Sequence, residues 1–247
     1  MLENLILILI GLLVSVYGTL IGAGGGFLVV PILLLFFGFA PQLAVGTSLV
    51  FVLFNGLSGG VAYGLKKRIN YKLGIPFALL TIPGAIIGAI VTTLFTTETF
   101  KTVFAVLLLL SAGAVIIRPR SRLASNPKQR SQMFYGYTIS FIVGFISSIF
   151  GIGGGIIHVP TMIYFLSMPV HVSTATSQFI LVISALLGVL SHSALNHISY
   201  TEAVYLSVGA LAGGQIGAYI SSKTRETIIA RSLGLGLALV GLRLLLF

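Results

Sequence analysis

Two glycine-rich segments are the residues of this sequence whose types and spacing point most clearly to a binding site. They are Gly22-Ala-Gly-Gly-Gly26 and Gly151-Ile-Gly-Gly-Gly155, and a proline lies five residues after each. Glycine tolerates backbone conformations closed to other residues and lets a ligand approach the main chain. A helix that begins after such a break offers free N–H groups and the positive end of its dipole, which suit an anion.

The candidate substrate-binding glycines are therefore Gly22, Gly24, Gly25, Gly26, Gly151, Gly153, Gly154 and Gly155. The alternative is that both segments only permit close helix packing, as small residues do in membrane helices. We assign that simpler packing role to the paired glycines Gly84, Gly88, Gly213 and Gly217, and also to Gly56, Gly60 and Gly64. The two triple-glycine segments differ from these because they break helices and recur.

Hydroxyl and amide side chains follow each glycine segment. Hydroxyls at these positions can cap helices or donate to substrate oxygens, and they can also bond their own backbone. The amides can either line a substrate path or join helices, because an unpartnered polar group is costly at membrane depth. The candidates are Thr47, Ser48, Thr176, Ser177 and Gln178 for binding, with Asn55 and Gln215 as polar lining.

His158 and His192 are the ionisable side chains that we place inside apolar segments. Intramembrane ionisable groups are functional candidates, and histidine can carry a coupling proton. A neutral, hydrogen-bonded histidine is the alternative. The remaining histidines, His171 and His197, are predicted to lie in loops or at the interface.

The composition excludes a soluble protein. Hydrophobic residues make up 57% and charged residues 7% of the chain, whereas soluble domains carry roughly 25% charged residues. The net charge of +10 lies mostly in short loops, so it indicates membrane topology and not nucleic-acid binding. An enzyme is not expected: the chain has four Glu, no Asp and no Cys, and it lacks the pattern Glu-x-x-His. No cofactor or metal site is predicted.

The sequence contains ten apolar segments, which are separated by short polar loops. They cover residues 5–21, 27–40, 44–65, 73–95, 102–117, 134–150, 156–168, 172–194, 203–221 and 227–246. The segments 27–40 and 156–168 are shorter than the roughly 20 residues that cross a bilayer. The first segment lacks a basic flank and runs into the glycine motif, so we interpret it as part of the mature fold.

The chain is internally repeated. Segment 22–89 aligns with segment 151–218 without a gap, and this repeat alignment pairs the glycines, the prolines Pro31 and Pro160, and the Thr-Ser pairs. The loop 66–72 is basic while its equivalent 195–201 is uncharged, and the reverse holds for 95–97 and 224–226. Equivalent loops should therefore face opposite sides, which is typical of inverted repeats.

These patterns predict an all-α polytopic membrane protein with roughly eight to ten membrane helices. Each half has a glycine-broken hairpin, re-entrant or fully spanning, followed by three ordinary spans. The expected units are repeat 1 over 1–117, a cytoplasmic basic linker over 118–131 and repeat 2 over 132–247, with both termini external. The two glycine breaks should then face each other near the membrane midplane.

The doubled pattern G-x-G-G-G-x4-P, from Gly22 to Pro31 and from Gly151 to Pro160, resembles the sulfite exporter TauE/SafE family. The resemblance covers essentially the whole length. It implies a multi-pass permease of a prokaryotic inner membrane that moves sulfite, sulfonates or related sulfur-containing anions, with the two glycine motifs as binding elements.

The expected function is a secondary transporter of such an anion, with the lipid bilayer as its environment and a proton as the candidate coupling ion. The alternatives are a gated anion channel and a transporter of another small organic anion. No charged side chain is predicted at the substrate, so backbone amides, hydroxyls and helix dipoles would hold it.

Overall fold

The fold is described from a computed structural model covering residues 2–117 and 129–246, with the side chains of 117 and 129–135 left aside. The described residues form ten helices and no strand, which confirms the predicted all-α class. The helices are α1 (Leu2–Ile21), α2 (Gly26–Phe36), α3 (Pro41–Leu65), α4 (Tyr71–Thr92), α5 (Thr97–Ile117), α6 (Gln129–Phe150), α7 (Gly155–Tyr164), α8 (Val170–Ala194), α9 (Tyr200–Lys223) and α10 (Glu226–Leu246).

Seven of the helices in the described part of the chain are long and apolar enough to cross a membrane: α1, α3, α4, α5, α8, α9 and α10. Three shorter apolar helices complete the set: α2, α7 and the described part of α6. Large apolar side chains such as Leu13, Leu110 and Leu239 are exposed on the outside of the bundle. Lipid must cover such a surface, so the chain is a multi-pass membrane protein.

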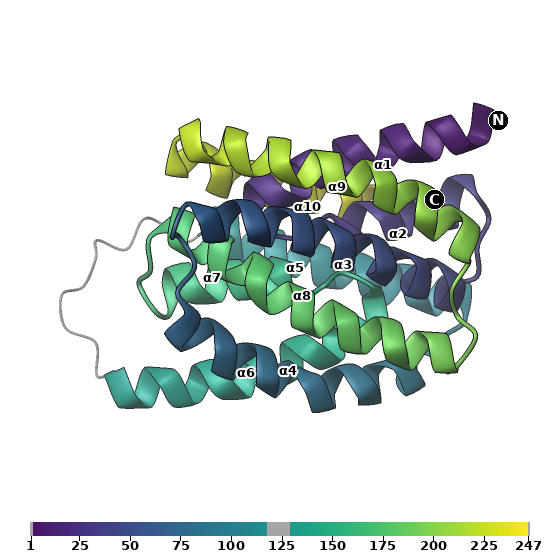
Figure 1. Cartoon of the computed structure of the whole chain (residues 1–247). Helices are drawn as coiled ribbons and strands as arrows, with labels where there is room; N and C mark the ends of the chain where they lie inside the picture. The colour runs from purple at the N-terminus through teal and green to yellow at the C-terminus, as the bar shows by residue number, and fades with distance from the viewer. Residues whose placement is uncertain (1, 118–128, 247) are drawn as a thin grey trace.

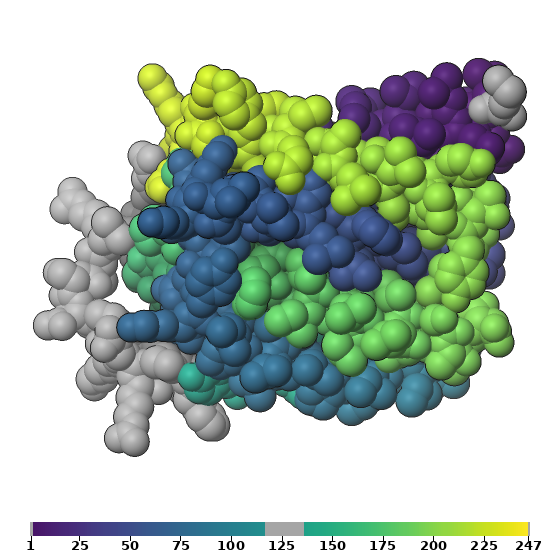
Figure 2. Space-filling view, viewed as in Figure 1, coloured from purple at the N-terminus to yellow at the C-terminus, as the bar shows by residue number. Residues whose placement is uncertain are grey.

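The helices are arranged symmetrically about the pair α3 and α8 (Figure 1). α3 packs against α9 and α8 packs against α4, while α1 lies along α9 and α6 along α4. α5 and α10 pack against each other. The space-filling view shows α9, α3, α8 and α4 as four successive bands on one face (Figure 2). Each element of the first half thus has a counterpart in the second.

Side-chain contacts show which helix ends lie together. Lys66 and Lys223, from two different basic loops, both lie over the ring of Tyr219, with Nζ 5.6 Å and 4.4 Å from the ring centre. At the opposite end, Gln42 and His197 line one cavity. The start of α3 therefore lies beside the end of α8, so these equivalent helices run in opposite directions. By the positive-inside rule we assign the lysine end to the cytoplasm.

The glycine hairpins enter and return at the same end. α1 begins at the outer end, because it runs parallel to α9: Gly209 packs against Ile8 and Gly217 against Val16. α2 has 11 residues, about 16 Å of helix, and ends four residues before α3 begins at that same outer end. It therefore reaches about halfway across a core of roughly 30 Å. α7 does the same from the cytoplasmic end with 10 residues.

The glycines assigned to packing lie at helix contacts. A Cβ built on Gly84 or Gly88 would overlap the carbonyl oxygen of Phe141 or Phe145 on α6. One built on Gly213 would overlap Leu12 O on α1, as one on Gly217 would overlap Val16 O. These glycines let the pairs α4–α6 and α1–α9 approach closely, as small residues do in membranes. A Cβ on Gly56 would overlap the side chain of Leu181. Gly60 and Gly64 differ from the other glycines assigned to packing, because a Cβ there would meet nothing closer than 3.4 Å.

The predicted linker 118–131 falls largely outside the described residues. α6 begins at Gln129, so its last residues are helical. The linker's side and the division of the chain at this point stay predictions.

Candidate functional site

Each glycine segment ends one helix and begins another. Gly22, Gly24 and Gly25 have φ angles of 75°, 81° and 76°, and their equivalents Gly151, Gly153 and Gly154 have 68°, 69° and 80°. These left-handed conformations are costly for residues with a Cβ. The first turns of α2 and α7 carry N–H groups without intrahelical partners. Two helix N-termini are thus placed inside the bundle.

The two breaks lie against each other. A Cβ built on Gly26 would overlap Gly151 O, and one on Gly155 would overlap Gly22 O. The serine of each Thr-Ser pair spans this contact: Ser48 Oγ donates to Gly151 O over 2.9 Å, and Ser177 Oγ donates to Gly22 O over 2.8 Å. The end of each broken helix is therefore held by the opposite half of the protein.

Val52 and Leu181 fill the centre between the breaks. They lie near the midpoints of α3 and α8, and the repeat alignment pairs them with each other. A Cβ on Gly153 would meet Val52 Cγ1 at 2.5 Å and Leu181 Cδ1 at 3.0 Å, and one on Gly24 would overlap Leu181 Cδ1. Both side chains are fully buried. In this conformation the centre is closed by apolar contacts.

The threonines of the Thr-Ser pairs do not reach the breaks. Thr47 Oγ1 accepts a hydrogen bond from the Ser199 N–H, and Thr176 Oγ1 accepts one from the Asn70 N–H, both over 3.0 Å. Ser199 and Asn70 are the residues that precede α9 and α4. The threonines therefore tie loops of the opposite half to α3 and α8.

Asn55 and Gln178 belong to a buried polar cluster beside the first break. Asn55 Nδ2 donates to Ser15 Oγ over 2.6 Å and to Thr19 Oγ1 over 2.9 Å. Gln178 Nε2 reaches Asn55 Oδ1 over 3.4 Å, while Gln178 Oε1 is buried without a partner. The cluster joins α1, α3 and α8. An unpartnered amide oxygen next to Ser177 leaves one hydrogen-bonding position open near the break.

His158 lies in the first turn of α7. Its Nε2 is 3.3 Å from Ser140 Oγ, and its ring stacks on Phe77 with centroids 6.3 Å apart. The other nitrogen, Nδ1, is buried without a partner, and a Cβ on Gly154 would lie 3.4 Å from it. His158 therefore directs a free ring nitrogen toward the second glycine turn.

His192 is fully hydrogen-bonded. Its Nε2–H donates to Ser148 O over 3.0 Å, and its Nδ1 is 3.4 Å from the Nδ1 of His197. The equivalent residue, Tyr63, makes the equivalent bond: its hydroxyl donates to Thr19 O over 2.9 Å. This symmetry favours a structural bond to the end of the preceding broken helix over proton transport.

Gln215 joins two helices away from both breaks. Its Nε2 donates to the backbone oxygen of Ser58 over 2.8 Å. The contact links α9 to α3, which is the simpler of the two roles considered for this amide.

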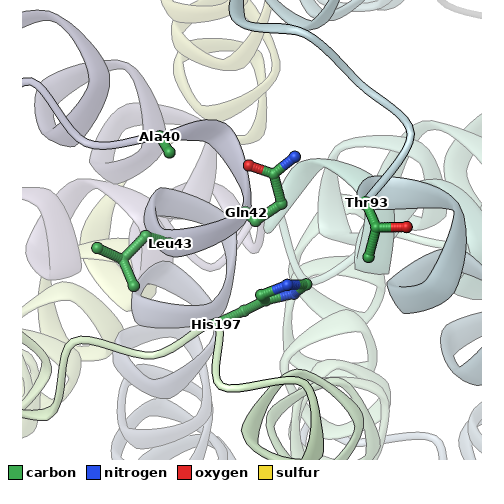
Figure 3. Close-up of a pocket in the computed structure, with 5 residues that line it drawn as sticks. All are labelled: Ala40, Gln42, Leu43, Thr93 and His197. Atoms are coloured by element: carbon green, nitrogen blue, oxygen red, sulfur yellow. The ribbon is translucent and has the colours of Figure 1, made fainter.

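A cavity of about 380 Å³ lies at the outer end of α3 (Figure 3). The residues that line it are Ala40, Gln42, Leu43, Thr93 and His197. Gln42 Nε2 donates to Thr92 O and Phe95 O over 3.2 and 3.1 Å, so the amide closes the end of α4. Burial lowers the pKa of His197 below its ordinary value of 6.5, which keeps this imidazole neutral near pH 7.

Sequence reasoning missed four residues that shape the site: Ser15, Thr19, Tyr63 and Ser148. A usable signal was present, because the repeat alignment pairs Tyr63 with His192 and, continued toward the N-terminus, pairs Thr19 with Ser148. Tyrosine and histidine can both donate a hydrogen bond. Their presence at equivalent positions predicts that each donates to the equivalent acceptor in its own half. Conventional motif spacing does not show this, because the acceptors are backbone oxygens.

A multi-pass helical bundle in which two broken helices meet is the arrangement found in many membrane transporters. Residues 7–244 match the family described as Sulfite exporter TauE/SafE, and the chain belongs to this family. This confirms the resemblance drawn from the motifs, and it makes the chain a membrane transporter and not an enzyme.

Relatives in bacteria and archaea carry matching descriptions. The chain is 35% identical to the probable membrane transporter protein YunE of Bacillus subtilis (strain 168), over 97% of this chain and 96% of the relative. It is 27% identical to the probable membrane transporter protein MJ0441 of Methanocaldococcus jannaschii, over 98% and 95% of the two chains. YjnA of B. subtilis, also a probable membrane transporter protein, is 30% identical over 88% and 90%. No solved structure matches the chain.

Proposed function

We propose that this protein is a secondary transporter of a small sulfur-containing anion, built from two inverted repeats that bind the anion between their glycine breaks. The observation that carries the proposal is the contact between the two glycine breaks, where α2 and α7 begin and where a serine of the other half donates to the carbonyl that follows α6 or α1. Free N–H groups and dipole ends favour an anion there without a full opposite charge. The family's description as sulfite exporters supports the choice of a sulfur oxyanion.

The packing of Val52 and Leu181 implies that a conformational change precedes binding of the anion. Because these side chains fill the space between Gly24 and Gly153, the two halves must shift before the N–H groups reach a ligand. Rocking of one repeat against the other around a central site is the motion expected of inverted-repeat transporters. The alternation would expose the breaks to one side at a time.

His158 is the proposed carrier of a coupling proton. Its free Nδ1 faces the Gly154 turn, so protonation adds a donor and a positive charge beside the second break. Binding of an anion and of a proton would then favour each other. His158→Gln should uncouple anion flux from an imposed pH gradient, while His192→Gln should leave the coupling intact.

The test is uptake into proteoliposomes of the purified protein, with sulfite, thiosulfate, a sulfonate and sulfate offered in turn. The expected result is saturable accumulation of at least one of them, driven by a pH gradient or a membrane potential. Ohmic current without accumulation would identify a gated channel instead. Absence of flux and of binding for every sulfur oxyanion would overturn the proposed substrate class.

A further inference from the structure

The cytoplasmic end of the bundle has a counterpart of the outer cavity, made of different residues. The repeat alignment pairs Gln42 with His171, and it pairs Arg68 with His197. The equivalents of Ala40 and Leu43 are Pro169 and Val172, and continuing the alignment past residue 89 pairs Thr93 with Ser222. His171 is the second residue of α8, at the cytoplasmic end, and Arg68 follows α3 there. The loop that carries Arg68 lies against the first turns of α8, because the Asn70 N–H donates to Thr176 Oγ1 over 3.0 Å, and the charge of Arg68 reaches the imidazole of His171.

The donors of the outer cavity are occupied, whereas those of its cytoplasmic counterpart are not. Outside, Gln42 holds two backbone oxygens and His197 faces His192. At the cytoplasmic end, Arg68 Nη1 and His171 Nδ1 are both buried and neither has a hydrogen-bond partner. A buried donor without a partner costs roughly 1–3 kcal/mol, and more when it is charged. Two such nitrogens at the same end of the bundle point to a missing acceptor.

The neighbouring charges narrow the choice of that acceptor. Lys66 is engaged by Ala218 O and by the Tyr219 ring, so it does not compete for the position. Glu226 is the acidic group whose charge also acts on His171, yet Arg68 Nη1 stays unpaired. A guanidinium with a free N–H and an adjacent imidazole match an oxyanion, which offers several acceptor oxygens and a compensating charge.

The same end continues inward as a polar track. The charge of the Arg68 guanidinium reaches the Tyr63 hydroxyl, and the buried side chain of Ser221 lies beside that hydroxyl. Tyr63 in turn holds Thr19 O, next to the Asn55–Gln178 cluster and the first glycine break. The free Arg68 nitrogen therefore lies at the cytoplasmic end of a series of polar groups that leads to the first glycine break.

We propose that Arg68 and His171 form a second oxyanion site at the cytoplasmic mouth, which takes up the transported anion on that side of the membrane. The choice of anion rests on the proposed function, whereas the site rests on the two unpartnered nitrogens. Its chemistry is that of a small oxyanion with two or more terminal oxygens. The phosphate of an anionic lipid presents the same groups, so the test separates the two sources.

The experiment is equilibrium binding of sulfite, thiosulfate, sulfate and phosphate to the full-length protein in phosphatidylcholine nanodiscs, by calorimetry. Arg68→Gln should raise the dissociation constant at least tenfold, and His171→Gln, which installs the outer residue, should raise it severalfold. Arg68→Lys should restore part of the affinity. Lys67→Gln is the matched control, because it removes one exposed charge from the same loop and should change binding less than twofold.

Three outcomes would overturn the site: no binding of any of the four anions, equal affinities of wild type and Arg68→Gln, or equal losses in Arg68→Gln and Lys67→Gln. Nanodiscs with phosphatidylglycerol form the second arm. Competition by this lipid that disappears in Arg68→Gln supports the oxyanion site with lipid phosphate as its occupant. The binding assay tests the site, and the flux assay tests the proposed function. Loss of binding in Arg68→Gln would therefore support the site even if no anion were transported.

Discussion

The two ends of the bundle share one architecture and differ in chemistry. Tyr63 and His192 occupy equivalent positions, and each donates to the equivalent carbonyl of a broken helix. Beyond them, the cytoplasmic end has Arg68, a permanent charge, while the outer end has His197, which is neutral near pH 7. Backbone geometry is thus maintained by symmetry while the charges at the two mouths have diverged.

The largest effect is expected from adding a methyl group at the first residue of α2 or α7. Gly26→Ala and Gly155→Ala should each reduce transport more than 100-fold, because the methyl group overlaps a backbone oxygen of the other half. Flux measurements and thermal melts of both variants check this. Gly38→Ala is the control: it also has a positive φ, 66°, but open space around it, so it should cost only about 1–2 kcal/mol. Unequal defects in the two glycine variants would break the symmetry argument.

The difference between the mouths can be reduced by His197→Arg. A permanent cation in the outer cavity should strengthen binding of an oxyanion from the outer side about tenfold, or ~1.4 kcal/mol. Transport from each side of oriented vesicles measures it. An unchanged outer affinity would show that the cavity with Gln42 and Thr93 does not meet the anion.

Exchanging the equivalent donors tests whether the two bonds are interchangeable. Tyr63→Phe and His192→Phe should each cost about 1–3 kcal/mol, because Thr19 O and Ser148 O lose a buried donor. His192→Tyr should retain most of the stability, since tyrosine makes this bond in the other half. Thermal melts of the four-protein set, wild type included, decide it. If His192→Tyr destabilised as much as His192→Phe, the geometries of the two halves would differ.

The smallest expected effect is the pH dependence contributed by His197. Its pKa is lower in the folded protein than the ordinary 6.5, so the folded state disfavours the charged form. The stability linked to His197 is complete above about pH 6.5 and falls as the pH drops toward the folded pKa. His197→Gln should therefore melt with a weaker dependence on pH between 7.5 and 5. A steeper dependence of the melting temperature on pH in the variant would show that folding does not lower the pKa of His197.

Much of the fold could be read from local patterns. Apolar length and composition predicted the membrane helices, and glycine runs predicted the breaks, since both depend on residues close together in the chain. The pairing of loops by charge predicted that the halves meet at Gly22–Gly26 and Gly151–Gly155. Which polar residues reach those breaks could not be predicted. Thr47 and Ser48 are adjacent, yet one holds a loop and the other a glycine carbonyl.

The sequence by itself determined that the protein lives in lipid, that it is duplicated and that each copy contains a broken helix. Only the tertiary structure decided that the hairpins return to the end where they begin, that Val52 and Leu181 close the centre, and that Arg68 and His171 have free nitrogens. The reason is physical. Helix breaks and hydropathy are properties of neighbouring residues, whereas a carbonyl bonded across 155 residues, as Gly22 O is by Ser177, exists only once both halves have packed.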